Sequence, residues 1–141
     1  MLTVNITPIP FFIRVLSIKK MQRILAVDDD KDILEILQLI LEDKGYEVET
    51  LTDGRNLFTT IQQYHPDLII LDIMLGNMDG RKLCQEVKAQ AHTNNIPVIL
   101  LSASHAVQRH NLHKNGNPDD FIAKPFDIDD LLNSVERQLV A

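Results

Sequence analysis

The chain has little of what would cross-link it or draw it to a polyanion. Cys84 is the only cysteine among 141 residues, so no internal disulfide can form. This fits a reducing compartment, most simply the cytoplasm, and we expect the thiol to be a small buried group rather than a nucleophile. The formal net charge is −6 and no cluster of Lys and Arg is visible. Direct binding to nucleic acid or to an anionic membrane surface is therefore disfavoured.

The chain also lacks a long hydrophobic run near its start. Residues 9–18 (IPFFIRVLSI) are apolar, but Arg14 interrupts them and a membrane helix needs about 20 apolar residues. No basic residue precedes the stretch and no small-residue cleavage site follows it, so it is a poor secretory signal. We expect residues 1–20 to form an extension of unknown role, either dispensable or a docking segment or dimer arm. Residues 21–141 are expected to form one domain.

From residue 22 onward, short apolar runs alternate with helical patterns. The runs are rich in aliphatic and β-branched residues, which is typical of strands buried on both faces of a parallel sheet. Apolar residues at helical spacing follow each run, although the stretch 105–115 is polar and gives the weakest helix signal. The alternation predicts an α/β fold with a doubly wound, parallel five-stranded sheet. The expected strands are 23–27, 47–51, 67–71, 97–101 and 120–123.

Polar residues stand where four of the five predicted strands end. Ligands of open parallel sheets bind outside the carboxyl ends of the strands. Crowded carboxylates repel one another unless a cation compensates, and Mg²⁺ prefers oxygen ligands. A site that adds a hydroxyl and a lysine can hold a phosphoryl group while a carboxylate attacks phosphorus. The residues are Asp28, Asp29 and Asp30 after the first strand, Asp72 after the third, Ser102 after the fourth and Lys124 after the fifth.

Four segments together resemble the successive motifs of response-regulator receiver domains, and the resemblance covers about residues 21–141. It implies a flavodoxin-like (βα)5 fold with strand order 2-1-3-4-5. It also implies a chain that takes a phosphoryl group from a sensor histidine kinase or a histidine phosphotransfer protein and is not a turnover enzyme. The segments are ILAVDDD at 24–30, DLIILDIMLGNMDG at 67–80, PVILLSA at 97–103 and DDFIAKPF at 119–126.

The resemblance implies a role for each matching residue. Asp72 would accept the phosphoryl group, Ser102 and Lys124 would contact its oxygens, and Phe121 would be the aromatic residue that turns inward on activation. The Lys124–Pro125 peptide bond would be cis. The Mg²⁺ ligands would be Asp28 (through water), Asp29, Asp72 and the backbone carbonyl of Met74.

The sequence departs from the family pattern at three places. The family usually has Pro where Gly76 stands, so the loop after Asp72 is expected to be looser. Phe121 replaces the more common Tyr. The polar stretch 110–120 carries Pro118 where small residues are usual, which suggests an atypical choice of partner. This stretch belongs to the face through which a receiver would bind a downstream protein effector, and the resemblance allows a dimer through the same face.

Three other functions fit parts of the sequence. A phosphatase with an aspartyl nucleophile would need a general acid two residues later, but Met74 stands there. A flavodoxin-like cofactor binder would need a donor-rich loop after the first strand, where the three acids stand. An interaction module that is never phosphorylated would not need the complete site. The chain is also compatible with the receiver part of a larger response regulator or hybrid kinase.

Overall fold

Five parallel strands form the centre of the molecule. The computed structural model describes residues 20–103 and 109–140, so the predicted extension lies outside the described residues except for Lys20. The strand order is β2-β1-β3-β6-β7, which confirms the predicted order 2-1-3-4-5 when these strands are counted along the chain. The strands are β1 (Arg23–Val27), β2 (Glu47–Leu51), β3 (Leu68–Asp72), β6 (Val98–Ser102) and β7 (Asp120–Ala123).

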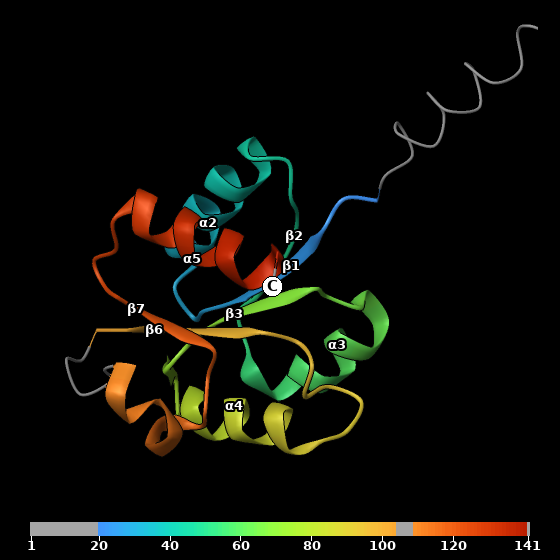
Figure 1. Cartoon of the computed structure of the whole chain (residues 1–141), viewed down its shortest axis with the longest axis vertical. Helices are drawn as coiled ribbons and strands as arrows, with labels where there is room; N and C mark the ends of the chain where they lie inside the picture. The colour runs from blue at the N-terminus through green and yellow to red at the C-terminus, as the bar shows by residue number, and fades with distance from the viewer. Residues whose placement is uncertain (1–19, 104–108, 141) are drawn as a thin grey trace, which may run out of the picture.

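Helices cover both faces of the sheet (Figure 1). Helices α2 (Lys31–Asp43) and α5 (Ile128–Val140) lie on one face, and α3 (Leu57–Tyr64) and α4 (Gly80–Ala89) lie on the other. Helices α2, α4 and α5 each begin at an aspartate cap, whereas Asn56 before α3 makes no capping hydrogen bond. The Asp30 carboxylate accepts a hydrogen bond from the backbone N–H of Asp32 at the start of α2, and Asp79 and Asp127 play the same role for α4 and α5.

The strand side chains alternate between two separate hydrophobic layers. In β1, Ile24 and Ala26 pack toward α2 and α5, whereas Leu25 and Val27 pack toward α3 and α4. Because successive side chains of a strand point to opposite faces, strands buried on both sides read as continuous apolar runs. We call the two clusters the α2–α5 layer and the α3–α4 layer.

Two segments differ from the sequence prediction. After β3 the chain forms a small antiparallel hairpin from β4 (Met74–Leu75) and β5 (Met78–Asp79), which was not predicted. The expected helix over 105–115 is, within the described residues, a 3-10 helix η3 (Arg109–Asn115) that is kinked at Asn111. The kink follows from a polar sequence without an apolar face. A second short 3-10 helix, η2 (Gly54–Asn56), precedes α3.

Candidate functional site

The predicted site residues converge at the carboxyl edge of the sheet. Asp28 directly follows β1, Asp72 and Ser102 are the last residues of β3 and β6, and Lys124 directly follows β7. Because these strands are parallel neighbours, their carboxyl ends share one edge. The Lys124–Pro125 peptide bond is cis, as predicted.

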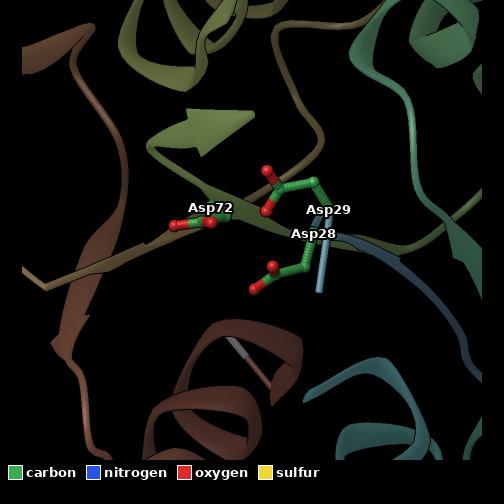
Figure 2. A group of neighbouring side chains, drawn as sticks. All are labelled: Asp28, Asp29 and Asp72. Carbon is green, nitrogen blue, oxygen red and sulfur yellow. The ribbon is translucent and has the colours of Figure 1, made fainter. Parts of the chain in front are cut away.

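Three carboxylates form the acidic part of the site. Asp28, Asp29 and Asp72 each offer an oxygen, and these oxygens lie within 4.8 Å of one another. Figure 2 shows the side chains reaching from the ends of β1 and β3 into one region. Asp28 is fully buried and Asp72 is 4% exposed, whereas Asp29 is exposed. Two of the three charges are therefore held away from water, where repulsion between them is screened least.

Lys124 partly compensates this charge. Its Nζ lies 2.8 Å from Oδ2 of Asp28 and 3.2 Å from Oδ2 of Asp72, and its side chain is 16% exposed. The backbone N–H of Lys124 donates a hydrogen bond of 2.7 Å to the Ser102 carbonyl, which ties the lysine to the end of β6. One ammonium group faces three carboxylates, so the formal charge of the site remains negative and suits a cation with oxygen ligands, such as Mg²⁺.

The protonation of the site follows from burial and charge. Burial raises the pKa of Asp72, and the charge of Asp28 raises it further. Lys124 and the backbone N–H of Met74 act in the opposite direction without cancelling this rise. Burial lowers the pKa of Lys124, but its hydrogen bond to Asp28 and the neighbouring carboxylate charges outweigh burial and raise it above the usual value. Lys124 is therefore a cation at neutral pH.

Backbone groups that the sequence analysis did not single out hold the carboxylates. The N–H of Asp30 donates to Oδ1 of Asp28 at 2.9 Å, and the N–H of Gly76 donates to Oδ2 of Asp29 at 3.1 Å. Gly80 packs under the end of β3, where a Cβ would lie 2.0 Å from the carbonyl oxygen of Asp72. The sequence showed a glycine at position 80, at the start of a predicted helix. It did not show that this glycine packs against the backbone of Asp72.

Met74 and Phe121, the two remaining predicted residues, lie in β4 and β7. Met74 belongs to β4 and its side chain is largely exposed. The predicted metal ligand at this residue is its backbone carbonyl, which does not depend on the side chain. Phe121 lies in β7, is partly buried, and packs against the α3–α4 layer. The preceding residue, Asp120, is buried on the opposite side, where it accepts hydrogen bonds from Ser134 (2.6 Å) and Arg137 (3.0 Å) of α5.

Comparison with known proteins agrees with this geometry. A model of the response regulator receiver domain family matches residues 24–136. The chain belongs to this family. Receivers of the family interact with histidine kinases, are phosphorylated, and bind Mg²⁺ at an acidic pocket, and this receiver has a cluster of three aspartates at the carboxyl edge of its sheet.

Relatives of this receiver include longer regulators. It is 37% identical over 119 residues to the DNA-binding dual master transcriptional regulator RpaA of Synechocystis sp., covering 84% of this chain and 49% of that protein. It is 33% identical over 118 residues to the DNA-binding response regulator MtrA of Mycobacterium tuberculosis, covering 84% and 50%. The chain thus spans about half the length of the curated relatives it matches.

Solved structures share the receiver's fold. A putative response regulator from Chloroflexus aurantiacus matches with a TM-score of 0.79 and 31% identity, covering 86% of this chain and 100% of that one. The chemotaxis protein CheY4 of Vibrio cholerae matches with a TM-score of 0.77 and 31% identity, covering 85% and 100%. The receiver therefore has the flavodoxin-like fold predicted from its sequence. Within residues 20–103 and 109–140, no helix is long and apolar enough to cross a bilayer.

Proposed function

We propose that this receiver takes a phosphoryl group from a sensor histidine kinase or a histidine phosphotransfer protein onto Asp72. One observation carries the proposal. A carboxylate that is only 4% exposed lies 3.2 Å from the ammonium group of Lys124, at the sheet edge where two further acids gather. The proposed Mg²⁺ ligands are Asp28, Asp29, Asp72 and the backbone carbonyl of Met74.

The transfer requires one bond to form and one to break. A carboxylate oxygen of Asp72 bonds to phosphorus while the phosphorus–nitrogen bond of the donor phosphohistidine breaks, and its electron pair stays on the imidazole nitrogen. Lys124 holds one phosphoryl oxygen through its charge, and the Ser102 hydroxyl donates a hydrogen bond to another. Bound Mg²⁺ supplies neutralisation of the remaining negative charge. Because phosphoryl transfer depends mainly on positioning and charge stabilisation, these groups suffice without a general acid.

The same contacts provide a switch. The new phosphoryl group draws Ser102 inward, and the ring of Phe121 fills the space that is left. The surface formed by η3, β7 and α5 then favours a downstream protein effector, or a second copy of the receiver. This is a shift between two populated states, driven by phosphate contacts that only one of them makes.

The proposal also covers how the chain is organised. Residues 21–141 act as the receiver domain and residues 1–20 as an extension of unknown role. The receiver works in the cytoplasm as a phosphoacceptor rather than a turnover enzyme, through a protein effector and without direct contact to nucleic acid or membrane. The net charge of −6 supports the absence of direct contact to nucleic acid or membrane. Since the relatives are about twice as long and two of them are described as DNA-binding, the alternative is a receiver part of a larger response regulator or hybrid kinase.

Phosphate labelling tests the assignment. The receiver is incubated with radiolabelled acetyl phosphate and Mg²⁺, and then with candidate phosphohistidine donors. Labelling should be lost in Asp72→Asn and on chelation of the metal. Asp30→Asn is the matched control, because Asp30 is an exposed neighbour whose capping role Asn fills equally well. Persistent labelling of Asp72→Asn would refute the proposal.

A further inference from the structure

The hairpin that follows Asp72 is closed by a two-residue turn, Gly76–Asn77. Leu75 of β4 lies opposite Met78 of β5, so only these two residues connect the strands. Gly76 has a φ of +61°. A glycine with positive φ at the first central position is the signature of a type II′ hairpin turn. Proline, the residue usual at this position, has φ fixed near −65° and cannot adopt this conformation.

The turn contacts the acidic site directly. The backbone N–H of Gly76 donates a hydrogen bond of 3.1 Å to Oδ2 of Asp29. Asp29 is the exposed member of the acid cluster, and an exposed side chain is otherwise free to change rotamer. The hydrogen bond therefore joins the loop after β1 to the loop after β3 and restricts the one carboxylate that burial does not hold. A proline would have no N–H with which to make this contact.

We propose that Gly76 is a positioning residue, whose amide holds Asp29 in place as a ligand for Mg²⁺. This inference rests on the proposed function. The hydrogen bond occupies one carboxylate oxygen and leaves the other available to the cation. Groups that hydrogen-bond a metal-binding carboxylate orient it, and their loss typically weakens metal affinity by about 10- to 100-fold. A proline at this position would stiffen the loop through its fixed φ. The glycine instead ties the loop to Asp29 through a hydrogen bond.

Two substitutions of Gly76 remove or keep the hydrogen-bonded turn. Gly76→Pro loses both the N–H and the positive φ, whereas Gly76→Asn keeps both, because Asn tolerates positive φ better than other residues with a side chain. A Cβ at this position would meet no atom within 4 Å, so the cost of a side chain here is the strain of the positive φ and not a clash. In calorimetric titration of each folded variant with Mg²⁺ alone, Gly76→Pro should bind about 10-fold more weakly than the natural chain. Gly76→Asn should stay within about 3-fold of it.

The outcomes distinguish a failure of the Gly76 role from a failure of the proposed function. Equal Mg²⁺ affinity of the natural chain and Gly76→Pro, or equal weakening by both substitutions, would overturn the role of the amide alone. A natural chain that takes up no Mg²⁺ would overturn the proposed function and this inference with it. Circular dichroism checks that each variant is folded before titration.

A second readout works even if Gly76→Pro fails to fold. In the metal-free natural protein, the Gly76 amide proton should be protected from exchange with solvent in ¹⁵N-resolved NMR spectra. Asp29→Ala removes the acceptor and should speed this exchange, while Asp29→Asn keeps an acceptor oxygen and should preserve much of the protection. Rapid exchange in the natural chain, or exchange unaffected by Asp29→Ala, would contradict the proposed contact.

Discussion

Replacing Asp72 by Asn should make the metal-free receiver more stable while abolishing phosphoryl acceptance. The substitution keeps the size of the side chain and an oxygen that can accept from Lys124. It removes a buried negative charge that lies close to two others. Functional sites often hold such unfavourable arrangements at the expense of stability.

The magnitude follows from the distances. The three carboxylate oxygens all lie within 4.8 Å of one another, and at that separation two like charges repel by about 3.5 kcal/mol at an effective dielectric constant of about 20. Asp72 faces two such repulsions, while attraction to Lys124 at 3.2 Å contributes about 5 kcal/mol. These charge–charge interactions alone disfavour the charge by about 2 kcal/mol, and burial, the largest cause of the raised pKa, disfavours it further. Since Asp29 is exposed and its repulsion is screened, we expect a gain of about 1 kcal/mol, or about 4 °C in Tm.

The gain should depend on pH in a defined direction. The folded-state pKa of Asp72 is raised, by burial first and by Asp28 second. Such a group stabilises the folded protein fully below its unfolded pKa of about 3.9, and this contribution is lost as the pH rises through the folded pKa. The free energy of unfolding of the natural chain is therefore furthest below that of Asp72→Asn at neutral pH. The difference should shrink as the pH falls through the folded-state pKa of Asp72.

Urea and thermal unfolding, followed by far-UV circular dichroism in a chelator, measure this difference. The chain has no Trp, so intrinsic fluorescence is a weaker probe. Asp43→Asn, at an exposed position in α2, is the control and should change little. Mg²⁺ at ten times its Kd should stabilise the natural chain and Asp43→Asn by about 1.4 kcal/mol, but not Asp72→Asn. A metal-free Asp72→Asn that is less stable at pH 7, or a difference that does not change with pH, would refute the reasoning.

Three further predictions concern neighbouring residues. Lys124→Met leaves the buried carboxylates without their cation and should lower the free energy of unfolding by about 3–5 kcal/mol at neutral pH; a loss below about 1 kcal/mol in urea denaturation would contradict this coupling. Gly80→Ala places a Cβ 2.0 Å from the Asp72 carbonyl oxygen and should cost about 2 kcal/mol or more in the same assay, unlike an unstrained exposed substitution. Burial raises the pKa of the Cys84 thiol to about 12, so a thiol reagent should modify it only at the rate of unfolding, and fast modification of the native protein would count against this.

The sheet was predictable because each central strand is buried on both faces. The run 23–27 therefore matched β1 residue for residue, and β3 and β6 were shifted by one residue. The run 47–51 also matched β2, although this edge strand is only partly buried. The hairpin of β4 and β5 escaped prediction because two-residue strands carry no periodicity. Likewise, the sequence at 109–115 has no apolar face that would distinguish a regular helix from a kinked 3-10 turn.

The candidate site was predictable to the level of side chains but not of backbone donors. Parallel strands bring their carboxyl ends to one edge, so Asp28, Asp72 and Lys124 were expected together and lie in contact. Which amide points at which carboxylate depends on loop conformation. Gly76 was read from the sequence as a source of looseness, whereas its positive φ forms a defined turn that holds Asp29.

The sheet of this receiver also acts as a partition. Side chains of a strand such as β1 pack on one side or the other, so the two hydrophobic layers have separate memberships. Substitutions that share no partners tend to have additive effects on stability. Helices on one side can therefore diverge toward a new partner without repacking the opposite side, while the strands between them keep the acids at a fixed spacing.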